Sequence, residues 1–195
     1  MITFDDDLQK IIDYKKHYEN DDIYYKEIIK NKLINNSNII KSLNNTDLDP
    51  DCPADYMGEN ILPYYLIVET QGKAKNYICF ETSFDEIARY NKVMKFGQVI
   101  FYIICDNKTI YDKNTGVARH DLLAALITDE FNWTNMFGTQ IKLVSNKPVA
   151  IDNQYVGRTL IFEQTTTNNI IKDRKVVNKS GGWYNGKQFV RDRFV

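Results

Sequence analysis

An uninterrupted apolar run, "VIFYIIC" at residues 99–105, limits the possible folds of this chain more than any other segment. It lies within "GQVIFYIICDN" (97–107), whose β-branched and aromatic residues predict a strand. Successive side chains of a strand point to opposite faces, so both faces of this strand are apolar. We therefore expect a helix on one face and another helix, a sheet or a subunit on the other. One face carries Val99, Phe101, Ile103 and Cys105, and the other carries Ile100, Tyr102 and Ile104.

Four further segments have the composition of strands, being rich in aromatic and β-branched residues or alternating in polarity. They are "YYLIVET" (64–70), "KNYICFET" (75–82), "TQIKLVSNK" (139–147) and "YVGRTLIFEQTT" (155–166). The intervening segment at 83–96 has no clear period, and we predict a short helix or an irregular lobe there.

A helix is predicted at 117–131, because apolar residues recur there at helical spacing and form a broad stripe. The stripe consists of Leu122, Leu123, Leu126, Ile127 and Phe131. We expect this helix to cover the face of the apolar strand that carries Val99, with Leu123, Leu126 and Ile127 in contact.

Two helices are predicted nearer the N-terminus, after a charged helix or arm at 1–22. The first has Ile28, Ile29, Leu33 and Ile34 on one face. The pair Asn35-Asn36 interrupts it, and Ser37 is the expected N-cap of the second, which carries Ile39, Ile40 and Leu43.

Together these elements predict an α+β fold: a mainly antiparallel sheet of about five strands with flanking helices. An N-terminal helical segment with a loop rich in proline and aspartate occupies 1–59, the α+β core domain occupies 60–167, and an extended C-terminal arm occupies 168–195. A chain of 195 residues is long enough for one such core with extensions.

Composition disfavours several classes of protein. The chain has 25 basic and 26 acidic residues, a balance that argues against binding nucleic acid mainly by neutralising phosphates. No apolar segment approaches the roughly 20 residues of a membrane-spanning helix, and the first residues lack the pattern of a signal peptide. The three cysteines fit neither a disulfide framework nor a zinc motif, so we expect buried thiols in a protein made in a reducing cytosol.

His120, one of only two histidines, is the residue most suggestive of catalysis, because it lies between Arg119 and Asp121. A nucleophile held on a sharp turn is missing, however, since no G-x-S-x-G motif occurs. Asp121 is placed to stabilise a helix start through its dipole. We expect His120 to be a packing or interface residue and predict that the chain is not an enzyme.

The sequence predicts neither a metal site nor a cofactor. Asp47, Asp49 and Asp51 alternate like the opening of an EF-hand loop, but prolines intrude and Gly58 stands where the bidentate glutamate belongs. Neither phosphate-binding glycine motif is present.

The segment "FNWTNMFG" (131–138) gathers four large apolar residues, Phe131, Trp133, Met136 and Phe137. They form either the core beneath the end of the helix, with Gly138 as its C-cap, or a binding surface for a partner. Both interpretations stay open.

The last 28 residues cannot form a core of their own and are expected to be a binding arm. Aromatic residues with arginines nearby are typical of binding segments. The candidate interface residues of the arm are Trp183, Tyr184, Phe189, Arg191, Arg193 and Phe194.

Several strings resemble a family of tailed-bacteriophage neck proteins, namely the tail-completion, tail-terminator or head-tail connector proteins. The resemblance covers roughly 31–167 and depends on order and character, since no catalytic signature carries it. The strings are "NNSNIIKSLNN", "LDPDCPADYMGENILPYYLIVET", "KNYICFET", "GVARHDLLAALITDEFNWTNMFGTQIKLVSNKP" and "YVGRTLIFEQTT".

The resemblance implies a structural virion protein that forms a homo-oligomeric ring, six- or twelve-fold, in the neck of the particle. Its partners would be neighbouring portal, connector or tail proteins and double-stranded DNA, which passes through the lumen without sequence recognition. The residues agree: a strand apolar on both faces and coreless arms need partner surfaces, and a nearly neutral lumen lets DNA slide. The alternative is a small cytosolic nucleic-acid-processing enzyme or a regulatory binding protein.

Overall fold

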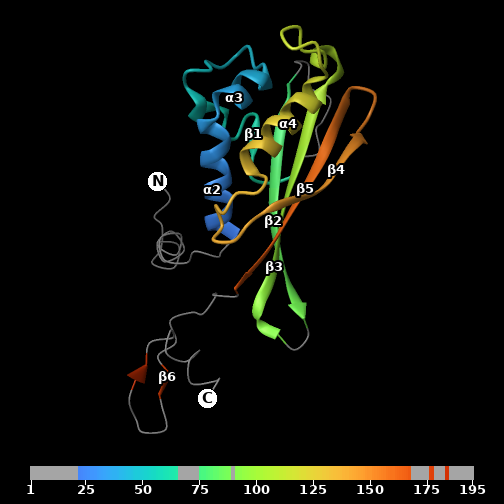
Figure 1. Ribbon diagram of the computed structural model, residues 1–195. Coiled ribbons are helices and arrows are strands. Elements are labelled where there is room, and N and C mark those ends of the chain that lie inside the picture. Colours follow the sequence, from blue (N-terminus) through green and yellow to red (C-terminus); the bar gives the residue numbers. More distant parts are fainter. Residues whose placement is uncertain (1–21, 66–74, 89–90, 168–175, 178–182, 185–195) are drawn as a thin grey trace.

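The computed structural model describes residues 22–65, 75–88, 91–167, 176–177 and 183–184 (Figure 1). The described helices are α2 (Asp22–Asn35), α3 (Ser37–Leu43) and α4 (Arg119–Phe131), with short 3-10 turns η1 (Pro53–Tyr56) and η2 (Asn107–Thr109). The strands are β1 (Ile61–Leu62), β2 (Tyr77–Ala88), β3 (Asn91–Asp106), β4 (Lys142–Ala150), β5 (Tyr155–Thr167), β6 (Val176–Val177) and β7 (Trp183–Tyr184).

The first five strands form one mixed sheet in the order β1-β2-β3-β5-β4. Only β1 and β2 are parallel, and the other three pairs are antiparallel. The predicted α+β class with a mainly antiparallel sheet of five strands and flanking helices is therefore confirmed. No helix among the described residues is long and apolar enough to cross a membrane.

The prediction of a helix or lobe at 83–96 is wrong. β2 continues to Ala88 and β3 begins at Asn91, so these residues form the end of a long antiparallel hairpin. Phe84 pairs with Gly97 and Asp85 with Phe96, while β5 pairs on the other side of β3. Pairing of β3 with β2 on one side and with the distant β5 on the other decides strand formation here, and the pattern within one segment cannot show it.

Two strand boundaries also differ from the prediction. Of the expected strand at 64–70, only Tyr64 and Tyr65 are described, and neither belongs to a strand. The short β1 precedes them and was not anticipated, since Ile61 and Leu62 gain their strand partner only from β2. The expected helix or arm at 1–22 lies outside the described residues except for Asp22, which begins α2.

The break between the first two helices is where it was predicted, but the cap is not. Asn36, and not Ser37, is the N-cap of α3: its side-chain oxygen accepts hydrogen bonds from the N–H groups of Asn38 (3.1 Å) and Ile39 (3.3 Å). Ser37 is the first residue of the helix. Asparagine and serine cap equally well, so local preference could not separate adjacent candidates.

The main core lies between the sheet and all three helices. It contains Val99, Phe101, Ile103 and Cys105 together with Leu123 and Ile127, and Leu126 packs against it while partly buried. The ring of Phe101 stands at its centre, 5.0 Å from that of Phe131 and 5.7 Å from that of Phe162. The predicted packing of the 117–131 helix on this face of the apolar strand is confirmed.

The opposite face of the sheet is covered less completely. A smaller buried cluster consists of Leu62, Tyr77, Cys79, Ile104 and Tyr155. Farther along the same face, Ile100 pairs directly with Ile161 and both side chains are half-buried. The described helices all pack on the other face. The prediction of a strand with two apolar faces is correct, but the second face is covered less completely than the first.

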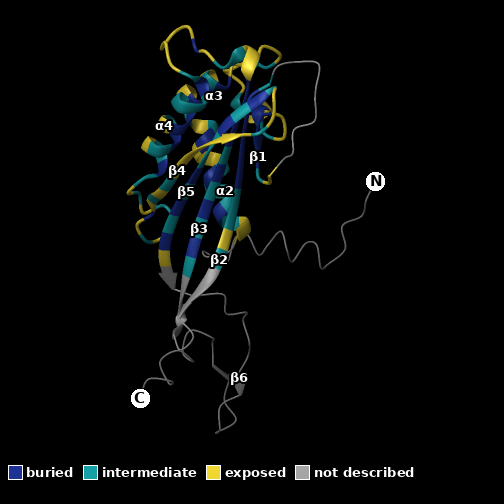
Figure 2. Cartoon of the chain, turned by 90° about the vertical axis from the view of Figure 1, so that its right-hand side faces the viewer, coloured by how far each residue is buried: buried dark blue, intermediate teal, exposed yellow. Residues whose placement is uncertain are grey.

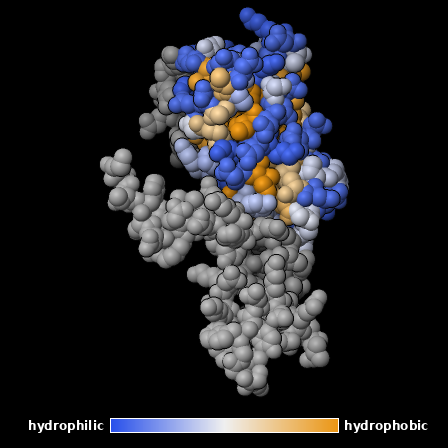
Figure 3. Space-filling model, turned by 90° about the vertical axis from the view of Figure 1, so that its left-hand side faces the viewer, coloured by the Kyte–Doolittle hydropathy of each residue, from blue (hydrophilic) through white to orange (hydrophobic). Residues whose placement is uncertain are grey.

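Helices α2 and α3 share the main core with the sheet. Tyr25, Ile29 and Leu33 of α2 are buried together with Phe80 and Phe101. Figure 3 shows the side of the molecule that carries α2 and α3, where a mainly hydrophilic surface surrounds smaller apolar patches. Side chains on both sides of the expected boundary at 59/60 are thus buried in one core.

Candidate interaction site at the end of α4

The helix α4 ends at Phe131, and its C-cap is Asn132, whose N–H donates to Thr128 O (2.9 Å). The prediction that Gly138 caps this helix is wrong. Gly138 has φ +86° and belongs to a separate turn, in which its N–H donates to Asn135 O (3.0 Å). The residue with left-handed backbone directly after the helix is Trp133, with φ +62°. Glycine usually takes that place, so a tryptophan there does not indicate the true end of the helix.

The two interpretations of the 131–138 cluster apply to different residues. Phe131 and Phe137 are core residues, and the ring of Phe137 stacks on Tyr25 with a centroid distance of 4.3 Å. Met136 packs against the core while partly buried. Trp133 is 61% exposed, so it alone of the four remains available to a partner.

An open groove of about 500 Å³ lies beside Trp133, between the last turns of α4 and the start of β4. Ala125 and Leu143 supply its apolar surface. Its polar lining consists of Thr128, Asp129, Asn132 and Asn146. We call this feature the Trp133 groove. Sequence analysis could not find it, because α4 and β4 form it together.

Hydrogen bonds fix the walls of the Trp133 groove. The side-chain oxygen of Asn132 accepts from Leu143 N (2.8 Å), which ties the helix end to β4. Trp133 N donates to Ile141 O (2.8 Å), and Ile141 N donates back to Thr134 O (2.9 Å). An exposed indole is thus held on a fixed backbone, which lowers the entropy that a partner must remove on binding.

A chain of polar contacts links the start of α4 to the Trp133 groove. His120 Nδ1 lies 2.9 Å from Asp121 Oδ1, and Arg158 Nε donates to the same carboxylate. Arg158 Nη1 then donates to Asn146 Oδ1 (2.6 Å). Burial raises the pKa of Asp121, but the hydrogen bond from Arg158 and the neighbouring positive charges outweigh it, so this pKa lies below its ordinary value. The arrangement holds α4 on β5 and β4.

The same arrangement is poorly suited to nucleophilic catalysis. The thiol whose pKa is affected by the charge of Asp121 is that of Cys105, which is fully buried in the main core. Burial raises its pKa to about 12, so the thiol stays protonated at neutral pH. His120 thus contacts the carboxylate of Asp121, which also accepts from Arg158. That His120 is a packing or interface residue stays our prediction.

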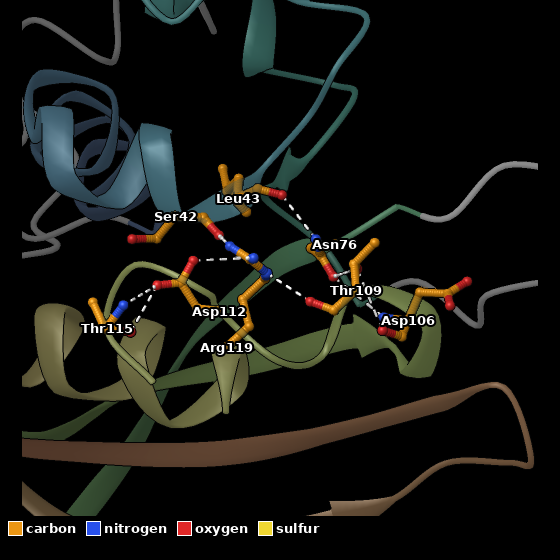
Figure 4. A network of polar contacts seen from close by, with 8 residues as sticks. All are labelled: Ser42, Leu43, Asn76, Asp106, Thr109, Asp112, Thr115 and Arg119. Atoms are coloured by element: carbon orange, nitrogen blue, oxygen red, sulfur yellow. Dashed lines mark hydrogen bonds and ion pairs between the residues drawn. The ribbon is translucent and has the colours of Figure 1, made fainter. Parts of the chain in front are cut away.

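A second polar network joins the loop after β3 to α3, and sequence analysis missed it (Figure 4). Arg119 is 4% exposed, and its guanidinium donates to Thr109 O (2.8 Å), Ser42 O (2.7 Å) and Asp112 Oδ1 (3.2 Å). Asp112 also accepts from Thr115 N (2.9 Å) and Thr115 Oγ1 (2.7 Å). The cation thus meets a carbonyl at the C-terminus of α3, where positive charge is favourable.

Asn76, like Arg119, joins the end of α3 to the residues at the end of β3 and after it. Its amide nitrogen donates to Leu43 O (2.8 Å), the last residue of α3, and its oxygen accepts from Asp106 N (3.2 Å) and Thr109 Oγ1 (3.2 Å). Asn60 donates to Asn76 O (2.8 Å). Every donor here meets an acceptor of the protein, so we interpret the network as structural.

The described residues include the aspartates that alternate at positions 47, 49 and 51. Among the described residues, no group of three or more His, Cys, Asp or Glu side chains could hold a metal ion. The alternating aspartates serve local turns: Asp47 N donates to Asn45 Oδ1 (2.8 Å) and Asp51 N to Asp49 Oδ1 (3.0 Å).

In the C-terminal arm, only the backbone of two short strands is described. Trp183 and Tyr184 form β7, which pairs antiparallel with β6. The side chains of these two residues, and the remaining arm candidates Phe189, Arg191, Arg193 and Phe194, lie outside the described residues.

Fold and site together define an α+β protein with an exposed tryptophan beside an open groove at the end of α4. The chain belongs to the YomW family, whose sequence pattern it matches over residues 5–164. The name of this family is phage-derived and indicates a phage-related protein. No curated protein matches the chain.

Proposed function

We propose that this chain is a structural virion protein that forms a ring in the neck of a tailed bacteriophage. In this role it joins the portal or connector to the tail and lines the passage for DNA. The phage-derived family supports the setting, and the resemblance of residues 31–167 to neck proteins supports the position.

The observation that carries the proposal is a pair of unlike surfaces on opposite sides of the sheet. One is the Trp133 groove, on the side that the helices cover. The other is the sparsely covered face with Ile100, Ile161 and Val149, the last of which is 38% exposed. A ring needs two different surfaces on each subunit, which meet head to tail around the axis.

The β4 edge of the sheet is a poor alternative for such contacts. β4 is one of the two edge strands, and most of its residues are exposed (Figure 2). It contains Lys142, Lys147 and Pro148 and has a register shift between Leu143 and Ser145. Lysines, proline and bulges protect edges from pairing with other strands. We therefore expect that subunits do not pair through β4 into a continuous sheet.

The charge balance agrees with a passage for DNA. With 25 basic and 26 acidic residues, the chain has no excess of positive charge to hold phosphates. A strongly basic lumen would retain DNA, whereas a nearly neutral one allows it to slide. The alternative of a nucleic-acid-processing enzyme lacks a specific observation in its favour: among the described residues, no group of three or more His, Cys, Asp or Glu side chains could hold a metal ion.

The test is to locate the protein in phage particles. Particles from a phage that lacks the gene are supplied with the full chain carrying a small tag and are viewed by electron microscopy with a tag-specific label. We expect a ring of label at the junction of head and tail, and completed particles only when the chain is added. Complete, infectious particles in its absence, or a label confined to the soluble lysate, would overturn the proposal.

A further inference from the structure

The Trp133 groove offers a set of groups suited to one kind of side chain. Asp129, at the rim, supplies a carboxylate for which the described structure shows no ion pair. The exposed indole of Trp133 supplies a flat π surface beside it. A carboxylate next to an indole favours a cation, above all an arginine, which can pair with one and stack on the other.

The remaining lining suits an extended peptide. Asn132 and Asn146 already use their oxygens, which accept from Leu143 N and Arg158 Nη1. Their amide N–H groups are left to donate to the carbonyl groups of a bound chain. Ala125 and Leu143 offer apolar contact for the stem of the arginine or for a neighbouring apolar side chain.

The chain itself contains a segment of this chemistry. Residues 168–195 have seven basic and two acidic residues, a net charge of +5, whereas residues 1–167 carry −6. The final part, "KQFVRDRFV" (187–195), has Arg191 and Arg193 with phenylalanines on either side. Charge complementarity thus favours contact between this segment and the body of the protein.

The direction of β5 favours a neighbouring copy over the same one. Phe162 of β5 pairs with Leu143 at the groove, and the strand then continues past it to Thr167. The last residue of β5 therefore lies five positions beyond the pairing with Leu143, in the direction away from the groove of its own copy. In a head-to-tail ring the groove of the next subunit takes its place.

We propose that the Trp133 groove binds residues 187–195 of a second copy of this chain, with an arginine of that segment between Asp129 and Trp133. The proposal deepens the ring-forming role above and depends on it for the presence of a second copy. Each subunit then has one groove and one segment that fits the groove of the next subunit, a head-to-tail contact that forms a ring when the rotation between subunits closes.

The experiment is disulfide capture between two forms of the full chain. Both carry Cys52→Ser, because Cys52 is exposed whereas Cys79 and Cys105 are buried. One form, with a size tag, carries Ala125→Cys in the groove, and the other carries Val190→Cys beside Arg191. On mild oxidation of the mixture we expect a disulfide-linked pair of the two forms as the main product.

Two groove variants and one matched control complete the design. Trp133→Ala or Asp129→Lys in the tagged form should lower the linked fraction at least several-fold. Tyr111→Ala, at a residue 62% exposed and thus as exposed as Trp133, should leave it unchanged. Thermal melting of each variant shows that the fold is retained, since neither groove residue is buried.

Three outcomes would overturn the proposal: no linked pair, a linked fraction insensitive to both groove variants, or linkage within one copy when both cysteines are on the same dilute chain. If particles show labelled rings but no disulfide-linked pair forms, the proposed contact in the Trp133 groove is wrong and the proposed neck role is retained. Capture without label in particles would reject the neck role and leave self-association through this groove.

Discussion

Trp133 occupies a backbone conformation that costs a bulky residue roughly 1–2 kcal/mol relative to its ordinary conformations. The hydrogen bond to Ile141 O and the bond between Asn132 and Leu143 hold it there. Because the indole is largely exposed, its burial contributes little stability to offset this strain. Strain retained at an exposed aromatic residue is more consistent with binding than with folding.

For His120, another single residue, we expect that substitution has little effect on stability or assembly. Its side chain is 17% exposed and contacts the carboxylate of the adjacent Asp121. We predict that His120→Ala lowers the free energy of unfolding by less than about 1 kcal/mol, as is usual for partly exposed pairs, and leaves particle assembly nearly intact. Chemical denaturation and particle counts measure both. Loss of an enzymatic activity with the fold preserved would show that the chain is an enzyme.

Asp112 is a residue whose charge the fold uses. The hydrogen bond from Thr115 Oγ1, which outweighs the opposing effect of burial, and the neighbouring Arg119 hold the pKa of Asp112 below its ordinary value. A lowered pKa means that the folded state favours the ionised carboxylate. The resulting stability is present above the unfolded pKa of about 3.9 and is lost as the pH falls through the folded pKa.

We therefore predict that Asp112→Asn costs about 1–3 kcal/mol at pH 7, because the buried Arg119 loses its carboxylate partner. The difference from the natural chain should begin to shrink as the pH falls below about 4, where Asp112 of the unfolded chain takes up a proton, and should be lost below the lowered pKa of the folded state. Urea unfolding at a series of pH values measures this, with the exposed Asp47→Asn as control. A difference that is constant with pH would contradict the ionic role.

At the scale of elements, the backbones of β3 and β5 approach each other very closely at Gly157. Gly157 pairs with Ile104 of β3 and Val149 of β4. A Cβ atom on Gly157 would lie 2.0 Å from Ile103 O, a distance that no pair of such atoms tolerates. The small residue is thus required by the approach of two backbones.

Gly157→Ala should therefore cost at least about 2 kcal/mol, because β5 must move away from β3 to admit the methyl group. The contrasting variant is Gly58→Ala, where φ is +83° but no atom lies within 4 Å of the added carbon. We expect only about 1 kcal/mol there, from the left-handed backbone alone. Equal melting temperatures for the two variants would show that the sheet opens without cost at this point.

At the scale of the whole molecule, the main core is built from residues between Tyr25 and Phe162. It joins α2, α3, α4 and the central strands, and all of its described members precede the C-terminal arm. The sparsely covered face and the Trp133 groove lie on opposite sides of this body. We therefore expect the arm to serve an interface and not the core.

Truncation after Asn168 should consequently leave a folded, soluble protein that fails to join particles. The unfolding midpoint should fall by no more than a few degrees, since no described core residue is removed. The measurement adds truncated and full-length protein separately to neck-deficient particles and counts those completed. Equal completion would mean that the arm is passive and that the interface lies on the sheet and the 131–138 cluster alone.

Patterns within short stretches of this sequence determined much of the fold. Helix and strand periods around Leu33, Leu123 and Phe101 gave the α+β class and the face on which α4 packs, because burial alternates with a fixed period along each element. Composition likewise indicated the lack of a membrane-spanning helix among the described residues. These properties depend on neighbours along the chain, so one sequence suffices to predict them.

Only the tertiary structure decided the hairpin at 83–96, the buried guanidinium of Arg119 and the Trp133 groove. Each depends on segments far apart in sequence: β3 with β5, α3 with the loop before α4, and α4 with β4. The four apolar residues at 131–138 look alike in sequence, yet Phe131 is buried and Trp133 is exposed. Their difference arises from the left-handed turn after α4, which bonds to Ile141 stabilise and which no local preference for tryptophan would suggest.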